Sequence, residues 1–420
     1  MSVFEIKEHV VEASYIREYA RATSHSQEEK LWLHVKEYIP KDNPYPRKGD
    51  VTIIGSHANG FPKELYEPLW EDIYHEAKSQ NLRIRSILIA DAAWQGQSGL
   101  INRDSLGNDP SWFDYARDML QMIQAFRSPL PIIGVGHSFG ANALTNLAFL
   151  HPRLLTSLVL LEPVISNYSS LPDRTVPGPA NISMSRREVW PSRKEAAAAF
   201  SRSPFFGTWN PRVLERWIKY GVTDVPEKDE VKLTTTKHHE VFNFLRPSWD
   251  AYDDEGKKLL RPELVPDLNP SLHPRWPTYP FYRPEGPDTV ARLPHLRPSV
   301  LYIFGGKSNV SPLELQEEKM TLTGSGVGGS GGQTKGRVKK VVGKDNSHLM
   351  PMEDPLFCAR VATQWIKAEV DRWRVDDLRY ENWTTKHAED KTTLSEEHKK
   401  FLAMYEGGSG KKRKQPNPKI

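Results

Sequence analysis

Short apolar runs alternate with helical segments along much of the chain, and this alternation constrains the fold more than any other feature. The period-two pattern around Leu31, Leu33 and Val35 predicts two strands within 3–39. We further predict strands at 51–56, 84–90, 130–135, 155–161, 299–304 and 338–342, and helices at 64–78, 112–126, 142–150, 313–320 and 355–375. Buried strands alternating with helices form βαβ units. The expected fold class is therefore α/β, with a mostly parallel central sheet and helices on both faces.

The alternation breaks between 166 and 295. Helix start signals occur there at Ser192 with Glu195 and at Asn210-Pro211. Eight prolines lie between 262 and 287, a density that no regular helix or central strand tolerates. We therefore expect a core first part at 1–165, an inserted helical and proline-rich cap at 166–295, a second core part at 296–385, and a C-terminal helix with a basic tail at 386–420.

The clearest chemical motif is Gly136-His137-Ser138-Phe139-Gly140. In a nucleophile elbow of this G-x-S-x-G form, the serine sits on a strained turn between a strand and a helix. Residues 328–332 also fit the pattern, but they lie in a glycine-serine stretch, an expected loop with no strand before it. The structural context therefore makes Ser138 the candidate nucleophile.

A serine nucleophile needs a base and an acid. In folds with a nucleophile elbow, the acid follows the serine along the chain and the histidine follows the acid. His348 follows the last predicted strand and is the candidate base; a helix-capping loop histidine is the alternative. Glu162 ends the strand after the elbow helix, where a buried carboxylate needs a partner, and is the candidate acid. A structural carboxylate is the alternative reading. The more usual acid position, after 299–304, holds Ser308, and Asp345 is the reserve candidate.

Acyl transfer also needs N–H donors for the negatively charged oxygen that develops on the substrate. One expected donor is the N–H of Phe139, directly after the nucleophile. The other is expected in the loop at 57–60, where small residues allow the backbone to approach the site. We favour the Asn59 N–H, with Ala58 as the adjacent possibility and an ordinary strand-ending turn as the alternative.

Metal and cofactor chemistry find little support in the sequence. His238-His239-Glu240 might suggest a metal site, but adjacent histidines point to different sides of a helix and no partner spacing is evident. Cys358 is the single cysteine, which removes thiolate metal sites and intramolecular disulfides, and fits a reducing or disulfide-free compartment. We expect neither a metal nor an organic cofactor.

The distribution of charge bears on possible partners. The formal net charge is +4, yet five basic residues and no acid lie in the last ten positions. The first 410 residues carry 52 basic side chains against 53 acidic ones, so we expect no nucleic-acid partner. No run approaches 18 consecutive apolar residues, so we expect no transmembrane segment.

Four features follow one another along the chain: the loop at 57–60, the turn at 91–98, Ser138 and His348. With them the chain resembles the α/β-hydrolase superfamily over about 50–165 and 298–375. The Asp91, Gly96 and Ser98 spacing matches the D-x-x-x-x-G-x-S turn of that superfamily. In finer features the chain is similar to fungal peroxisomal α/β-hydrolases, including the peroxisomal lipase of yeast and hydrolases of host-selective-toxin biosynthesis. These features are His57 to Phe61, Asn102-Arg103, Leu106-Gly107, Trp112, Ala116-Arg117-Asp118, Leu161-Glu162-Pro163-Val164 and Gly306-Lys307-Ser308-Asn309.

The expected function is hydrolysis of a carboxylic ester or thioester through an acyl-serine, as in a lipase, esterase or acyl-CoA thioesterase. The alternatives are an acyltransferase with the same residues and a non-catalytic binding protein of this fold. An apolar acyl substrate would suit a roof of aromatic residues in the insertion, although these could equally form the insertion's own core. They are Trp190, Phe205, Phe206, Trp209 and Trp276.

The chain ends in Pro418-Lys419-Ile420, a variant of the small-basic-aliphatic tripeptide that peroxisomal import receptors read. It departs from the S-K-L consensus at its first and last positions. The basic residues upstream usually help such a signal, so we expect a peroxisomal location with the import receptor as a partner. A cytoplasmic location is the alternative. In place of an import signal, the tail would then be a disordered basic segment, or 411–414 would form a nuclear signal.

Overall fold

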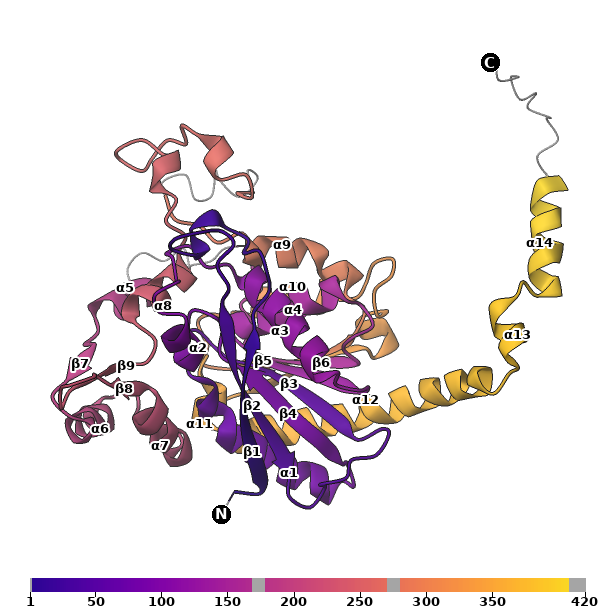
Figure 1. Ribbon diagram of the computed structural model, residues 1–420, viewed down its shortest axis with the longest axis horizontal. Coiled ribbons are helices and arrows are strands. Elements are labelled where there is room, and N and C mark those ends of the chain that lie inside the picture. Colours follow the sequence, from indigo (N-terminus) through magenta and orange to yellow (C-terminus); the bar gives the residue numbers. More distant parts are fainter. Residues whose placement is uncertain (1, 168–177, 270–279, 408–420) are drawn as a thin grey trace. The chain divides into compact units, whose positions relative to one another are not determined.

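The computed structural model describes residues 2–167, 178–269 and 280–407. The chain divides into two compact units, Met1–Val370 and Asp371–Ile420. In the first unit, eight strands form one sheet in the order β1-β2-β4-β3-β5-β6-β10-β11 (Figure 1). The strands are β1 (Phe4–Glu12), β2 (Trp32–Pro40), β3 (Val51–Ser56), β4 (Ile84–Ala90), β5 (Ile132–His137), β6 (Ser157–Leu161), β10 (Ser299–Gly305) and β11 (Val338–Gly343).

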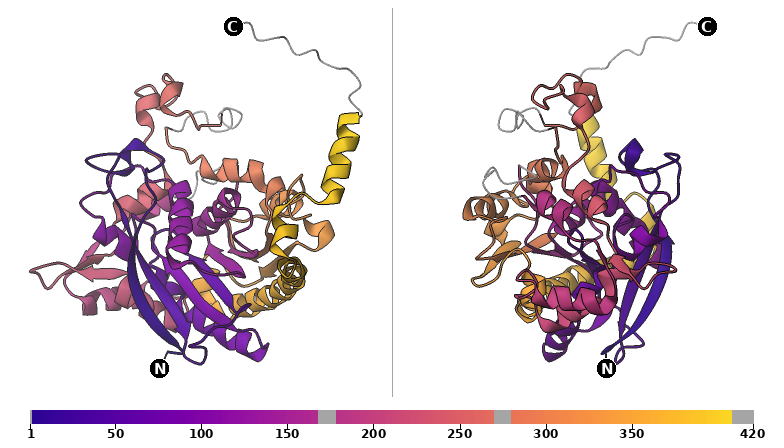
Figure 2. Two further views of the ribbon diagram at one scale, coloured as in Figure 1. Left: turned by 45° about the vertical axis from the view of Figure 1, so that its right-hand side comes forward. Right: turned by 90° about the vertical axis from the view of Figure 1, so that its left-hand side faces the viewer.

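The pairing within this sheet is mostly parallel, as predicted. From β4 to β11 every neighbouring pair is parallel, whereas β1–β2 and β2–β4 are antiparallel. The long pair β1–β2, drawn in indigo, forms one edge of the sheet (Figure 2). Strand β3 lies between β4 and β5, so the chain adds β4 on one side of β3 and then β5 on the other side. In open α/β sheets the crevice at such a switch point, beyond the carboxyl ends of the strands, is where ligands bind.

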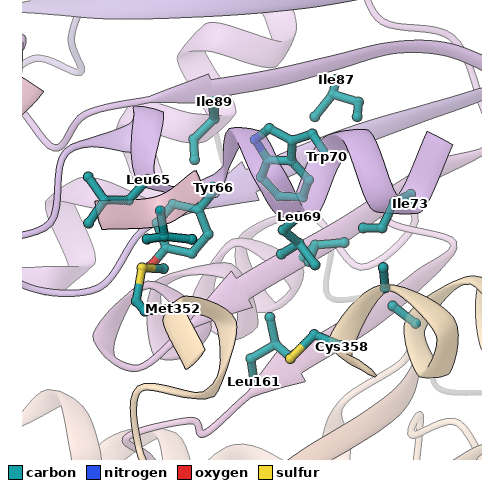
Figure 3. Close-up of a cluster of buried hydrophobic side chains, with 14 of the residues drawn as sticks. Leu65, Tyr66, Leu69, Trp70, Ile73, Ile87, Ile89, Leu161, Met352 and Cys358 are labelled. Carbon is teal, nitrogen blue, oxygen red and sulfur yellow. The ribbon is translucent and has the colours of Figure 1, made fainter. Parts of the chain in front are cut away.

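Helices cover both faces of the sheet. The helices of the first unit, including those of the cap, are α1 (Glu67–Ser79), α2 (Gly96–Ile101), α3 (Trp112–Phe126), α4 (Phe139–Leu150), α5 (Pro179–Ser185), α6 (Arg193–Arg202), α7 (Pro211–Tyr220), α8 (Lys237–Phe244), α9 (Glu285–Arg292), α10 (Leu313–Leu322), α11 (Met350–Glu353) and the start of α12 (Pro355–Thr384). Alternate residues of β6 explain the two layers. Val159 and Leu161 face a buried cluster with α1, α11 and α12 (Figure 3), while Leu158 and Leu160 face a cluster with α3, α4 and α10.

The cap segment between β6 and β10 contains a small sheet that the sequence does not predict. Strands β7 (Val189–Trp190), β9 (Val231–Leu233) and β8 (Val222–Asp224) pair antiparallel beside α6 and α7 (Figure 1). Strands of two or three residues are too short to produce a readable period. The predicted starts of α6 and α7 are confirmed, since Ser192 and Asn210 accept hydrogen bonds from the backbone at Glu195 and Arg212.

The end of the predicted insertion packs as part of the core. Val290 of α9, with Leu293 and Leu296 just after it, belongs to the buried cluster on the α4 side of the sheet. Proline is tolerated in α9 because Pro287 lies in its first turn, where no intrahelical bond is lost. All residues between Asn269 and Pro280, Trp276 among them, and the C-terminal tripeptide lie outside the described residues.

The second unit contains the end of α12, α13 (Ala388–Thr392) and α14 (Glu396–Gly407). At the start of α14, the Ser395 hydroxyl accepts from the His398 N–H. Thr393 donates its hydroxyl hydrogen to the Glu389 carbonyl. Over the described ranges, no helix has both the length and the apolar character needed to cross a membrane.

Candidate active site

Ser138 lies between β5 and α4, on the turn where the elbow motif predicts it. Its φ of 59° and ψ of −123° place it in a strained conformation for a residue with a side chain. Gly140 makes this turn possible, because a Cβ there would lie 2.4 Å from the His57 carbonyl oxygen. The turn thus brings the start of α4 directly against the loop that follows β3.

Three predicted side chains meet at this turn. The His348 Nε2 atom lies 3.0 Å from the Ser138 Oγ, and the His348 Nδ1 atom lies 3.0 Å from the Glu162 Oε2. Both lengths fit hydrogen bonds. Ser138 is 7% exposed and Glu162 is fully buried, whereas the His348 side chain is 21% exposed. The serine, histidine and glutamate therefore form one hydrogen-bonded chain, open to solvent at the imidazole.

Glu162 occupies a pocket of hydrogen-bond donors. It follows β6 with a φ of 46°, and its Oε1 accepts from the Gly305 N–H at 2.6 Å. Its Oε2 accepts from the hydroxyls of Ser308 and Ser311 at 2.7 and 3.0 Å. A carboxylate with four donors, counting His348, has the partners that its burial requires.

The other positions considered for the acid have different roles. Ser308 occupies the usual acid position and contacts the Glu162 carboxylate instead of the histidine. The reserve candidate Asp345 is 93% exposed at its side chain and pairs with Lys307 at 3.2 Å. Ser311, which the sequence analysis missed, shares the Glu162 carboxylate with Ser308. A hydroxyl three residues beyond Ser308 gave no distinctive pattern that could have identified it.

Hydrogen bonds with buried groups hold the loop after β3 in place. The Ala58 N–H donates to the Tyr66 hydroxyl at 2.8 Å, so this alternative donor is already engaged. The His57 Nε2 accepts from the Ala92 N–H, and its Nδ1 lies 2.9 Å from the Ala58 carbonyl. Among the residues that the structure describes, none accepts a hydrogen bond from the N–H of Asn59 or of Phe139. Both predicted donors thus remain available.

The cap helix α8 closes over the same loop. The Asn59 side chain donates to the Glu240 carbonyl at 2.9 Å, and a Cβ at Gly60 would touch the Glu240 carboxylate. The adjacent histidines do not act together: His239 bonds to Thr236, whereas Glu240 pairs with Arg186 and accepts from Ser183. In the described part of the chain, no group of three potential metal ligands converges.

The insertion's aromatic side chains pack largely on one another. Trp209 and Trp217 are buried, and both contact Phe61 of the loop after β3, with ring centroids 5.4 and 6.2 Å apart. Trp190 is buried against Phe200. The aromatic cluster is therefore a core of the cap that packs against the loop after β3. Phe205 is its exposed member, with 52% of its surface exposed.

Comparison with known proteins agrees with this fold. Residues 55–361 match the alpha/beta hydrolase family, and the chain belongs to that family and is a hydrolase. It is 40% identical over 396 residues to a type I acyl-CoA thioesterase of Penicillium roqueforti, covering 88% of this chain and 89% of that one. It is 38% identical to a type I acyl-CoA thioesterase of Penicillium brevicompactum, covering 99% of each.

The structural comparison supports the fold. The peroxisomal alpha-beta-hydrolase Lpx1 of Saccharomyces cerevisiae superposes with a TM-score of 0.66 at 17% identity, covering 97% of this chain and 98% of that one. An abhydrolase domain-containing protein of Alternaria alternata is 27% identical over 245 residues, covering 57% of this chain and 84% of the relative. The predicted resemblance to fungal α/β-hydrolases is confirmed.

Proposed function

We propose that this enzyme hydrolyses acyl thioesters through an acyl-serine intermediate, with an acyl-CoA as the thioester. The observation that carries the proposal is the hydrogen-bonded chain from Glu162 through His348 to Ser138 on the elbow turn. The thioester is supported by the two Penicillium relatives, which are named acyl-CoA thioesterases and match nearly the whole chain. Simple carboxylic esters, which use the same chemistry, are expected to be weaker substrates.

In the first half of the reaction, His348 takes the proton of Ser138 while the Oγ attacks the acyl carbonyl. The Asn59 and Phe139 N–H groups donate to the oxyanion of the tetrahedral intermediate. Glu162 accepts from the His348 Nδ1 and stabilises the imidazolium that forms. The imidazolium then protonates the departing thiolate, which leaves an acyl group on Ser138.

Water completes the cycle. His348 removes a proton from a water molecule that attacks the acyl-serine, and the acid leaves as the Ser138 hydroxyl is restored. The 21% exposure of the His348 side chain is consistent with water reaching this base. No step requires a metal or an organic cofactor.

The test compares wild type with Ser138→Ala. Wild type should release free thiol from acyl-CoA and form a mapped fluorophosphonate adduct at Ser138. Ser138→Ala should keep its unfolding midpoint and lose about 10⁴-fold or more in kcat. A wild type that neither releases thiol nor reacts with the probe would refute the proposal. A screen of acyl-CoA and glyceride esters then defines the acyl chain.

We also propose that the enzyme is peroxisomal, with an import receptor binding the C-terminal Pro418-Lys419-Ile420. Support comes from the yeast relative of the same fold, which is named a peroxisomal hydrolase. Fluorescently tagged wild type should form puncta that coincide with a peroxisomal marker. Deletion of the last three residues should disperse them, and unchanged puncta would reject the tripeptide as the signal.

A further inference from the structure

Two buried side chains outside the proposed Ser138, His348 and Glu162 set connect the parts of the site. The Tyr66 hydroxyl lies 2.8 Å from the Ala58 nitrogen and 2.8 Å from the His137 Nδ1. The His137 Nε2 lies 2.8 Å from the His348 carbonyl oxygen. This chain of three hydrogen bonds runs from the loop after β3 to the backbone of the proposed base.

We infer that Tyr66 and His137 are positioning residues that hold the loop after β3 and the backbone of His348 in one hydrogen-bonded unit. The inference deepens the proposed function and rests on it, because it assigns these two side chains to the support of that reaction. Neither side chain is placed to touch substrate, so neither is a catalytic residue.

The direction of each hydrogen bond follows from the groups involved. The Ala58 N–H can only donate, so the Tyr66 hydroxyl accepts from it and has its own hydrogen for the His137 Nδ1. The His348 carbonyl can only accept, so the His137 Nε2 carries the other hydrogen. His137 is therefore neutral, with its proton on Nε2.

Burial keeps this arrangement fixed. Tyr66 is 1% exposed and His137 is fully buried. Burial, with the nearby His348, lowers the pKa of His137 to about 3, so the ring stays neutral throughout the working range. Burial also raises the pKa of Tyr66 well above its usual value, so the hydroxyl remains a donor. The unit has no charge to gain or lose, which suits a support better than a switch.

The surrounding packing fits the same role. Tyr66 ends the short 3-10 helix η2 (Lys63–Tyr66) and belongs to the buried cluster that also contains Met352 of α11 (Figure 3). Helix α11 begins two residues after His348. By engaging the Ala58 N–H, Tyr66 also leaves Asn59 as the free donor of that loop.

The test uses two variants of His137 that divide its two contacts. In His137→Gln the side-chain amide reaches the position of Nε2 and can still donate to the His348 carbonyl. In His137→Asn the amide reaches only the position of Nδ1, so the contact with Tyr66 can persist and the one with His348 is lost. Tyr66→Phe removes the hydroxyl and frees the Ala58 N–H.

We expect His137→Gln to keep kcat within about threefold of wild type and His137→Asn to lose about tenfold, a loss of one hydrogen bond's typical size. KM should stay within about twofold in both, because substrate binding is not touched. Fluorophosphonate labelling of Ser138 should slow in parallel with kcat. Tyr66→Phe keeps the contact between His137 and His348 but frees the Ala58 N–H, and it should also lose about tenfold in kcat. Equal kcat in the two His137 variants, or losses that follow their unfolding midpoints, would overturn the inference.

A second measurement does not depend on turnover. In ¹⁵N-histidine NMR, the signal that disappears in His137→Gln should show a neutral ring protonated at Nε2, and it should shift in Tyr66→Phe. An inactive wild type would refute the proposed function, and the NMR result would then decide the positioning inference alone. A ring protonated at Nδ1, or a signal unaffected by Tyr66→Phe, would overturn it.

Discussion

Asp91 and Glu162 each follow a strand of the parallel sheet and are each fully buried, yet their surroundings differ. Asp91 lies 2.6 Å from the Lys63 ammonium and accepts from the Lys63 and Gln97 N–H groups at 2.9 Å. Glu162 accepts from one N–H, two hydroxyls and the imidazole of His348. In the described ranges no lysine or arginine lies within ion-pair distance of it.

The buried lysines near these carboxylates show the same difference. Burial alone would lower the pKa of Lys63, but Asp91 and Glu64 raise it above its usual value. Burial lowers the pKa of Lys319 to about 8, and the charges of Glu318 and Glu162 offset this only in part. Asp91 is thus neutralised by a permanent cation. Glu162 has no such cation paired with it in the described ranges, so its carboxylate can stabilise the imidazolium that forms during the reaction.

The largest expected effect is on catalysis in Glu162→Gln. The neutral amide cannot stabilise the imidazolium and favours the wrong histidine tautomer, so kcat should fall by about 10³ to 10⁴-fold. The unfolding midpoint should change little. Steady-state acyl-CoA hydrolysis measures the first quantity and thermal unfolding the second. Near-normal turnover would mean that another residue supplies the acid.

Asp91→Asn should show the opposite pattern. It leaves Lys63 buried without its partner, so the free energy of unfolding should fall by about 3 to 5 kcal/mol. The folded fraction should keep kcat within about tenfold of wild type, because Asp91 contacts none of the proposed reacting groups. Urea unfolding measures the loss. A stable variant with strongly reduced kcat would break the contrast between the two carboxylates.

Much of the fold was predictable because it depends on local periodicity. The strand at 84–90 and the helix at 112–126 have the bounds that the sequence predicts, since apolar spacing and caps define them. The small sheet of the cap was not predictable, because its strands are held by pairing between distant segments. For the same reason, α9 could not be recognised as part of the core packing around α4.

The candidate site was predictable where chain order carries information. Ser138 and His348 follow from a motif and a position after a strand, and Glu162 from a carboxylate that ends an apolar run. Tyr66 and Ser311 were not predictable, since common residue types at unremarkable spacings reach the site only through folding. The sequence shows that Ser308 occupies the position where an acid is usual. Its contact with Glu162 could not be predicted, because that contact depends on how β10 lies beside β6.

Lys319→Met tests whether the second buried lysine is a counter-charge. With a folded pKa near 8 and an unfolded value near 10.5, the cost of burying the charge is fully present below pH 8. The variant should therefore be about 2 to 3 kcal/mol more stable at pH 7, and the difference should shrink toward pH 10 as wild type loses the proton. Lys63→Met is the matched control and should destabilise. Greatly reduced turnover in Lys319→Met would show that Glu162 depends on this cation.

The smallest expected effect concerns the hydroxyls that take the place of a cation beside Glu162. Ser308→Ala removes one of four donors, so the carboxylate is less firmly held against His348. We expect kcat to fall about threefold to tenfold, the size of one hydrogen bond to a charged group, with KM nearly unchanged. Ser308→Thr retains the hydroxyl and should stay close to wild type, and Ser308→Ala with Ser311→Ala should lose more than either alone. If the double variant matched wild type, the Gly305 N–H and His348 would suffice to hold the carboxylate, and the difference from Asp91 would rest on the missing cation alone.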